Sequence, residues 1–250
     1  MTDIVSHRGG ALLWPENSRV AFENTAKLPV EQVEFDVHFS ADGQLVVIHD
    51  ATLDRTTDGT GPVVARSWAE LSRLVLRGTG GQRMLLLDEV IELFRPTSIG
   101  LRIEIKPGPG RVPYPDLPRR VMETLRDQHM LERCVITSFQ LGTVCEAVSF
   151  AMPRTHAWLV NPDLQTDLGL SAVCAAARTR GVPMLGLRSS KLEAEAASTV
   201  RASGLEIGGW ACNDADTIVR MFELNVAGFT TDRPDLALQL RSQNHQEDRR

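Results

Sequence analysis

Short apolar segments alternate with amphipathic segments along nearly the whole chain, and this alternation limits the possible folds more than any other feature. Amphipathic helical patterns separate most of the apolar segments, for example Asp116–Gln128, Ser171–Arg180, Lys191–Ala202 and Asp214–Leu224. The apolar segments that we predict to be strands are Asp3–His7, Gln32–Phe39, Leu45–His49, Ile99–Ile105, Val135–Phe139, Thr155–Val160, Pro183–Leu187, Glu206–Trp210 and Gly228–Thr231. Strands that alternate with helices indicate an α/β fold with a parallel sheet and the helices outside it.

The number of strands favours a closed barrel. Gln32–Phe39 and Leu45–His49 are close enough in the chain to act as one hairpin-like unit, which leaves the eight strands that an α/β barrel needs. A length of 250 residues also fits one such barrel better than two average domains. The alternative fold is an open, doubly wound sheet.

Residues 51–83 interrupt the alternation. This segment is rich in Thr and Gly and contains one helical piece, near Trp68–Leu76. About thirty residues are too few to hold a core of their own, so we predict a small insertion in a single domain that spans residues 1–241. Residues 242–250 are polar and lack periodicity, which is typical of a disordered tail.

The charge balance and the cysteines limit the class of protein. A formal net charge of -5 disfavours nucleic-acid binding, because contact with a phosphate backbone requires clustered Lys and Arg. No segment approaches the ~18 apolar residues of a membrane helix, so no stable membrane association is expected. The N-terminus lacks the pattern of a signal peptide. The four cysteines are widely spaced, which favours reduced thiols. Together these features predict a cytoplasmic protein.

Three carboxylates are predicted inside the barrel. Alternate residues of a strand share a face, so Glu34 and Asp36 point the same way, as do Glu104 and Lys106 in the IEIK segment. Apolar side chains normally fill a barrel interior, and a buried carboxylate is costly unless it is paired or bound to a metal. One lysine cannot neutralise three carboxylates, so a hard divalent cation is the better explanation. Ordinary salt bridges at strand ends are the alternative.

Two histidines end apolar segments. His7 closes IVSH and His49 closes LVVIH, and barrel active sites are assembled where strands end. Such a pair could act as general acid and base in the cleavage of a phosphate ester, although each could also be a hydrogen-bonded packing residue. We assign the base to His7 and the acid to His49. His38 lies on the Glu34 face and is a further candidate.

Arg8 and Lys106 are the candidate phosphate-binding residues. An arginine offers a planar fork to two oxygens, whereas a lysine supplies a compact point charge. Beside a metal site and two histidines, these two cations would complete a site for a phosphodiester monoanion.

The chain resembles the glycerophosphodiester phosphodiesterases in the wording and order of its motifs. The longest of these motifs, EFDVHFSADGQLVVIHDATLDRTTDGTG, is highly specific, and together the motifs extend over essentially the whole chain. The matching segments are HRGG (His7–Gly10), PENS with AF (Pro15–Phe22), the long motif itself (Glu34–Gly61), IEIKP (Ile103–Pro107), TSF (Thr137–Phe139), the GW-x-x-N region (Gly209–Asn213) and GFTTDRP (Gly228–Pro234).

The resemblance implies a triosephosphate-isomerase-type (β/α)8 barrel with a small insertion after the second strand. It also implies metal-dependent hydrolysis of glycerophosphodiesters, such as glycerophosphocholine or glycerophosphoethanolamine, to sn-glycerol 3-phosphate and an alcohol. The residues that it assigns to the site are the acid/base pair His7 and His49, the Mg²⁺ or Ca²⁺ ligands Glu34, Asp36 and Glu104, the phosphate-binding Arg8 and Lys106, and Trp210 on the glycerol side.

Two other functions stay open on the same barrel. A lysophospholipase D-like or phosphoinositide-cleaving enzyme would need an apolar rim, for which Trp14 and Trp68–Leu76 are the candidates. A catalytically dead barrel that only binds a phosphodiester is the third reading. The chain departs from the family wording at Ala211-Cys212 and around Arg188, in the part that shapes the pocket for the alcohol group.

Overall fold

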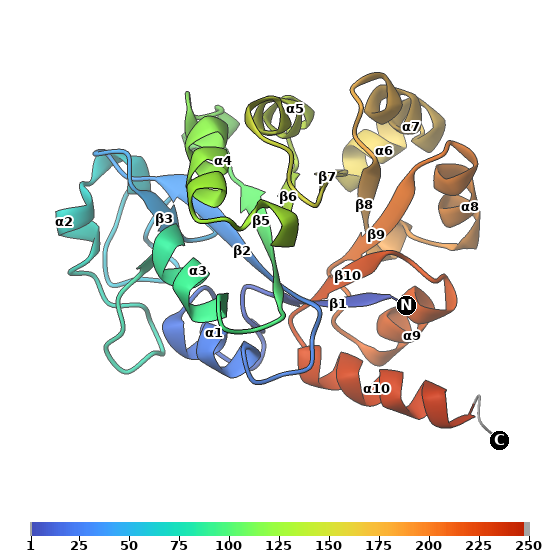
Figure 1. Cartoon of the computed structure of the whole chain (residues 1–250), viewed down its shortest axis with the longest axis horizontal. Coiled ribbons are helices and arrows are strands. Elements are labelled where there is room, and N and C mark those ends of the chain that lie inside the picture. Colours follow the sequence, from blue (N-terminus) through green and yellow to red (C-terminus); the bar gives the residue numbers. More distant parts are fainter. Residues whose placement is uncertain (1, 248–250) are drawn as a thin grey trace.

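The computed structural model describes residues 2–247 and contains a closed barrel of parallel strands (Figure 1). The first strand pairs with both the second and the last, which closes the sheet and rules out the open, doubly wound alternative. The barrel strands are β1 (Asp3–His7), β2 (Gln32–Phe39), β5 (Gly100–Ile105), β6 (Cys134–Ser138), β7 (Thr155–Leu159), β8 (Met184–Arg188), β9 (Glu206–Trp210) and β10 (Gly228–Thr231). The predicted eight-stranded barrel is therefore confirmed.

Helices surround the barrel because each connection between parallel strands must cross back over the sheet. Ser18 and Asp214 cap two of them, each through a side-chain oxygen that accepts from a backbone N–H of the first turn. The helices are α1 (Arg19–Thr25), α2 (Trp68–Leu71), α3 (Leu87–Phe94), α4 (Leu117–Asp127), α5 (Leu141–Phe150), α6 (Pro162–Leu168), α7 (Leu170–Thr179), α8 (Ala194–Ala202), α9 (Ala215–Glu223) and α10 (Pro234–Glu247), with 3₁₀ turns η1 (Val63–Ala65), η2 (Pro109–Arg111), η3 (Leu131–Arg133) and η4 (Ser189–Lys191).

The main core lies between the barrel wall and the helices. Alternation in β2 turns Phe35 away from the barrel axis, where its ring meets Phe22 of α1 edge-on at 5.8 Å between centroids. Phe22 in turn contacts Phe94 of α3 at 6.0 Å. All three rings are fully buried, so the outward face of β2 is fixed by aromatic packing. The opposite face of the same strand is left to polar side chains.

An antiparallel hairpin extends the sheet beside β2. β3 (Leu45–Val47) pairs antiparallel with β2, and β4 (Leu85–Leu86) pairs antiparallel with β3. The insertion, residues 51–83, lies between β3 and β4 and packs on the hairpin through a small second core. This core consists of Val46, Ile48, Leu53, Val63, Leu71, Leu76 and Met84. The insertion therefore shares a core with β3, in keeping with its small size.

The helical piece of the insertion is shorter than the predicted Trp68–Leu76. Helix α2 ends at Leu71, because the next residues leave the helix to form isolated bridges, Thr57 with Leu76 and Val75 with Arg83. Leu71 and Leu76 are buried in the second core, so they do not provide the apolar rim that a lipid enzyme would need. Val75, at 36% exposure, is the exception in this segment.

The position of His49 differs from the expected one. The predicted strand Leu45–His49 ends at Val47, and Ile48 N donates to Asp36 O at 3.1 Å as the chain runs back along β2. His49 therefore lies two residues beyond the end of the strand, and the predicted end of this strand is wrong. The hairpin instead returns the chain to the mouth of the barrel, where His49 lines the cavities described below.

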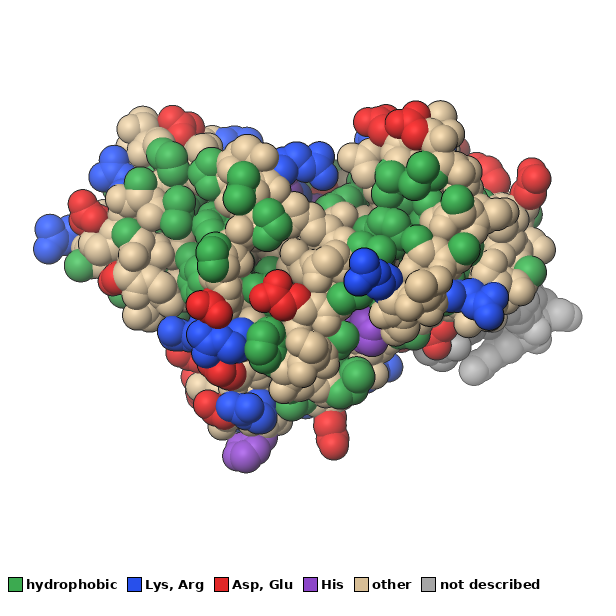
Figure 2. Space-filling model, turned by 90° about the horizontal axis from the view of Figure 1, so that it is seen from above, with side chains coloured by type: hydrophobic (Ala, Val, Ile, Leu, Met, Phe, Trp, Pro, Cys, Tyr) green, Lys and Arg blue, Asp and Glu red, His purple; other side chains and the backbone are tan. Residues whose placement is uncertain are grey.

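Helix α10 reaches Glu247, so it enters the range 242–250 for which a disordered tail was expected; residues 248–250 lie outside the described residues. Within residues 2–247 no helix is both long and apolar enough to cross a membrane. On the face drawn in Figure 2, Lys and Arg are interspersed with Asp and Glu in small groups. The predicted lack of nucleic-acid binding stays a prediction.

All four cysteines are free thiols, as expected from their spacing. Cys134, Cys174 and Cys212 are buried, and Cys145 is partly buried. Burial raises the pKa of Cys134 and of Cys212 to about 12, so neither sulfur is an effective nucleophile near neutral pH.

Candidate active site

Three buried carboxylates lie at the carboxyl end of β2 and β5. In the register of these strands Asp36 faces Glu104, and Glu34 precedes Asp36 on the same strand face. One oxygen from each of the three side chains lies within 4.8 Å of the others. Oxygen ligands at this spacing suit a hard divalent cation, so the donor set fits the predicted metal site.

The charge of this carboxylate cluster is only partly compensated by the protein. Lys106 Nζ lies 2.6 Å from Glu104 Oε1 and 3.1 Å from Asp36 Oδ1. The second contact lacks the geometry of a hydrogen bond, so Asp36 Oδ1 has no hydrogen-bond partner in the described part of the chain. Asn17 Nδ2 donates to the other oxygen, Oδ2, at 3.0 Å. A buried carboxylate oxygen with an ion pair but no hydrogen bond is consistent with a position that binds a cation.

The pKa values of Glu34 and Asp36 show how burial and neighbouring charges act on the carboxylates when no cation is bound. Burial, reinforced by the charges of Asp36 and Glu104, raises the pKa of Glu34 to about 7. Burial alone would also raise the pKa of Asp36, but the charges of Lys106 and Arg8 outweigh it and hold that pKa well below its ordinary value. A divalent cation would remove the mutual repulsion that keeps Glu34 from ionising.

The carboxylate of Asp232, the residue that follows the last barrel strand, holds the His7 ring in place. Its Nδ1 lies 2.5 Å from Asp232 Oδ1, and its Nε2 lies 3.7 Å from Glu34 Oε2. Asp232 is fixed in turn by Asn213, which donates through Nδ2 to Oδ2 at 2.6 Å and accepts from the Asp232 N–H at 2.8 Å. Burial would lower the pKa of His7, but Glu34 and the hydrogen bond to Asp232 outweigh it and raise the pKa.

His49 has an equivalent carboxylate partner next to it in the chain. Its Nδ1 lies 2.6 Å from Asp50 Oδ1, and Arg55 of the insertion clamps both oxygens of Asp50 at 2.7 and 3.0 Å. The hydrogen bonds from Arg55 hold the pKa of Asp50 well below its usual range. In both histidines Nδ1 is hydrogen-bonded to a carboxylate, so Nε2 is the nitrogen available for proton transfer with the reacting groups.

A chain of alternating charges joins His49 to the carboxylate cluster. Arg55 makes a second pair of hydrogen bonds, at 2.6 and 2.7 Å, to the two oxygens of Glu16. Glu16 accepts from Arg8 Nη1 at 3.1 Å, and Arg8 Nε lies 3.5 Å from Asp36 Oδ2. The Arg8 N–H also donates to Glu34 at 3.2 Å, from a backbone with φ of 50°. Gly10, the second glycine of HRGG, has a φ of 90°. Glycine adopts this conformation without steric strain, and it therefore permits this tight turn.

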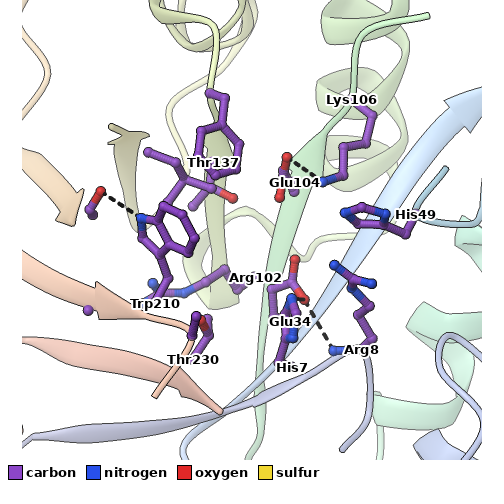
Figure 3. A pocket seen from close by; sticks show the side chains of 15 residues that line it. His7, Arg8, Glu34, His49, Arg102, Glu104, Lys106, Thr137, Trp210 and Thr230 are labelled. Carbon is purple, nitrogen blue, oxygen red and sulfur yellow. Dashed lines mark hydrogen bonds and ion pairs between the residues drawn. The ribbon is translucent and has the colours of Figure 1, made fainter. Parts of the chain in front are cut away.

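An enclosed cavity of about 230 Å³ opens beside the carboxylate cluster. Figure 3 shows Trp210 and Thr137 on one side of it and His49 and Arg8 on the other. Trp210 is held by a hydrogen bond from its Nε1 to Gly186 O at 3.2 Å, and its ring meets Phe139 edge-on. The cavity thus has apolar walls and a charged rim, the usual composition of a small-molecule site.

A larger, open groove of about 830 Å³ adjoins this cavity. Both spaces are lined by His49, Glu104, Lys106, Phe139 and Trp210, whereas His7 lines only the enclosed one. The two spaces therefore meet at the carboxylate cluster and lead away from it in different directions.

The structure brings together all eight residues that the family resemblance assigned to the site. His7, Arg8, Glu34, His49, Glu104, Lys106 and Trp210 line one cavity, and Asp36 joins Glu34 and Glu104 in the carboxylate cluster. His38 is instead a packing residue: its Nδ1 lies 3.1 Å from the Tyr114 hydroxyl and its Nε2 lies 3.0 Å from His49 O. Burial lowers the pKa of His38 to about 4, which keeps the ring neutral.

Sequence reasoning missed most of the residues that hold the site in place. Asp232 and Glu16 contact the nominated His7 and Arg8, and Asn213 and Arg55 hold these two carboxylates in turn. Arg102 lines the enclosed cavity. Four of the five lie within motifs noted above and Arg102 directly precedes one, but no motif pairs one residue with another. Arg102 shares a strand face with Glu104, a signal that alternation alone would have given.

Comparisons with known proteins identify the family of this chain. The family model described as "Glycerophosphoryl diester phosphodiesterase family" matches residues 7–236, nearly the whole chain. The chain belongs to this family. Among curated family members, a glycerophosphodiester phosphodiesterase of Bacillus altitudinis is 30% identical over 97% of this chain and 99% of its own length. The family resemblance inferred from the motifs is therefore confirmed.

Solved structures of family members have the same fold. A putative glycerophosphoryl diester phosphodiesterase from Agrobacterium tumefaciens is 36% identical, with a TM-score of 0.96 over 98% of this chain and 99% of that one. An Oleispira antarctica phosphodiesterase, solved in complex with the product sn-glycerol-3-phosphate, is 22% identical with a TM-score of 0.80 over 97% of both chains. At that identity the second structure supports the fold alone.

Proposed function

We propose that this protein hydrolyses glycerophosphodiesters to sn-glycerol 3-phosphate and an alcohol, with a divalent cation held by Glu34, Asp36 and Glu104. The single observation that carries the proposal is the carboxylate cluster with two carboxylate-held histidines, His7 and His49, at one cavity. The family names a phosphodiesterase activity, and the Oleispira antarctica relative binds sn-glycerol-3-phosphate.

The cation, Mg²⁺ or Ca²⁺, would offset the charge of a phosphate oxygen and acidify a hydroxyl or water beside it. Arg8 and Lys106 contribute positive charges that contact the carboxylate cluster directly. Because Glu16 and Asp36 anchor Arg8, and Glu104 and Asp36 anchor Lys106, neither cation is free to swing away from a bound phosphate.

The two histidines have different surroundings, and this difference supports the assignment of base and acid. His7 lines only the enclosed cavity, which suits the glycerol arm with Trp210 at its wall. There His7 Nε2 is placed to take a proton from the nucleophile, either water or the glycerol 2-hydroxyl. His49 also lines the open groove, where the departing alcohol can leave, and so it is placed to return a proton to the alkoxide.

The test is product release from glycerophosphocholine, glycerophosphoethanolamine and glycerophosphoinositol. We expect sn-glycerol 3-phosphate from at least one of them, and a drop of roughly a hundredfold or more in His7→Ala and His49→Ala. His129→Ala is the matched control, because His129 has no place in either cavity. Equal rates in all four proteins would overturn the proposal.

A lysophospholipid is a second candidate substrate. Three exposed apolar side chains lie in the segments that follow β1, β5 and β7: Leu12 (63% exposed), Val112 (64%) and Leu168 (57%). Such a rim could receive an acyl chain. If lysophosphatidylcholine micelles are cleaved faster than glycerophosphocholine, and Leu12→Ser with Val112→Ser removes the difference, the lysophospholipase D-like function replaces the first.

A further inference from the structure

Two exposed arginines add positive charge to the open groove. Arg111 of η2 and Arg188 at the end of β8 both line it and are both exposed. Neither guanidinium makes a hydrogen bond or ion pair with any other side chain in the described part of the protein. This contrasts with Lys106 inside the groove, which is fully engaged by Glu104 and Asp36. The two arginines are therefore available to a ligand.

The acidic residues of the groove only partly balance these arginines. Asp50 is held by Arg55 and His49, and Glu104 is held by Lys106. Asp163 of α6 is the remaining carboxylate at the groove, and its side chain has no partner among residues 2–247. Two available cations thus face one available anion, which gives the groove a positive bias away from the carboxylate cluster.

The aromatic rings of the groove are already in contact with cations of the protein. The Arg188 guanidinium carbon lies 5.6 Å from the centroid of the Trp210 ring, and Lys106 Nζ lies 6.0 Å from that of Phe139. A quaternary ammonium ligand is normally recognised by open aromatic faces. Here such a ligand would have to displace Arg188 from Trp210 and would meet its charge.

We propose that the groove binds the alcohol arm of the diester and selects arms that carry a negative charge over arms that carry a quaternary ammonium group. Arg188 and Arg111 are the specificity-determining residues. A carboxylate or phosphate on the arm would accept hydrogen bonds from the fork of Arg188, which its contact with Trp210 already orients. This inference rests on the phosphodiesterase activity proposed above and adds the class of alcohol to it.

The test uses three diesters of sn-glycerol 3-phosphate whose arms carry a positive charge, no charge and a negative charge. The arms are 2-(trimethylammonio)ethyl, its neutral isostere 3,3-dimethylbutyl, and 2-carboxyethyl. For the unaltered protein we expect kcat/KM for the carboxylate arm to exceed that for the ammonium arm by about tenfold. The preference should shrink as KCl is raised from 20 to 500 mM, values chosen to shorten the Debye length from roughly 20 Å to about 4 Å.

Two variants assign the preference to its residues. Arg188→Gln and Arg111→Gln should each lower kcat/KM for the carboxylate arm about threefold to tenfold and leave the neutral arm within about twofold. Arg178→Gln is the matched control, because Arg178 is an equally exposed arginine in the last turn of α7, outside both cavities.

The outcomes separate this inference from the proposed function. Equal cleavage of all three arms, or faster cleavage of the ammonium arm, would overturn the charge preference while the phosphodiesterase activity stands. A loss in Arg188→Gln that is the same for every arm would show that Arg188 only supports Trp210, and would also overturn it. Cleavage of none of the three would overturn the charge preference, and would overturn the phosphodiesterase activity as well if glycerophosphoethanolamine and glycerophosphoinositol are also left intact.

Discussion

His7 Nδ1 lies 2.5 Å from Asp232 Oδ1, although 225 positions separate the two residues in the chain. The contact exists because the barrel closes: β1 and β10 are neighbours, and His7 and Asp232 stand at their carboxyl ends. Closure of the sheet and assembly of the site are therefore the same structural event. The Asp50 carboxylate does for His49 what Asp232 does for His7, from a residue next to it in the chain.

Asp232→Asn should lower kcat while leaving the fold intact. The amide keeps the size of the side chain but no longer holds His7 Nδ1 as a charged acceptor, so the ring loses its orientation and tautomer. We expect a loss of about ten- to a hundredfold in kcat, measured beside the thermal midpoint. Asp235→Asn, which alters an exposed ion pair with Arg233, is the control. An unchanged kcat in Asp232→Asn would contradict the role of this contact.

Arg55→Gln should shift the pH dependence of the reaction. Arg55 holds the pKa of Asp50 low, so its loss lets that pKa rise towards its ordinary value. Asp50 would then become protonated, and release His49, at a higher pH than in the unaltered protein. The acidic limb of kcat against pH should therefore move to higher pH. Arg73→Gln, another exposed arginine of the insertion, should leave the profile in place; an identical shift there would refute the explanation.

Glu34→Gln should separate metal binding from folding. Without a cation, burial and the charges of Asp36 and Glu104 disfavour an ionised Glu34, so the neutral amide should leave the thermal midpoint in EDTA unchanged or raise it. Binding at a hundred times the dissociation constant adds about 2.7 kcal/mol of stability to the unaltered protein. Excess Mg²⁺ or Ca²⁺ should then raise its midpoint by several degrees but not that of the variant. Equal rises in both would argue against Glu34 as a ligand.

Tyr114→Phe tests the assignment of His38 as a packing residue. The hydroxyl is the partner of buried His38 Nδ1, so its removal leaves that nitrogen unsatisfied. The expected cost is about 1 to 3 kcal/mol in the free energy of unfolding, measured by denaturant titration. Because burial keeps His38 neutral and both of its ring nitrogens are engaged, by Tyr114 and by His49 O, His38 takes no part in proton transfer and kcat should stay within about threefold. A large drop in kcat with little loss of stability would return His38 to the site.

Most of the fold could be predicted from the sequence. The bounds of β1, β2, β9 and β10 are those expected from the apolar segments, β5 and β7 differ by one residue at one end, and β6 and β8 are shifted by one residue at both ends. A buried parallel strand gives a strong signal because both of its faces are apolar. The insertion was less predictable, since the end of α2 depends on bridges to residues far along the segment rather than on local propensity.

The site was predictable only where strand alternation and motifs point to single residues. Glu34 and Asp36 follow from the period of β2, and the register with β5 then adds Glu104. The partners of the histidines depend on which chain segments meet at the mouth of the barrel. Arg55, for example, reaches Asp50 and Glu16 only because the insertion folds back over the hairpin. No local pattern encodes that contact.

The most direct test of metal-dependent hydrolysis measures release of sn-glycerol 3-phosphate by the unaltered protein and by Glu34→Ala. Both proteins are assayed with EDTA and again after Mg²⁺ or Ca²⁺ is restored. We expect the unaltered protein to show release that EDTA abolishes and that one of the two ions restores. We expect no release above background from Glu34→Ala. Release that persists in EDTA, or that survives the loss of Glu34, would contradict a metal-dependent reaction at the carboxylate cluster.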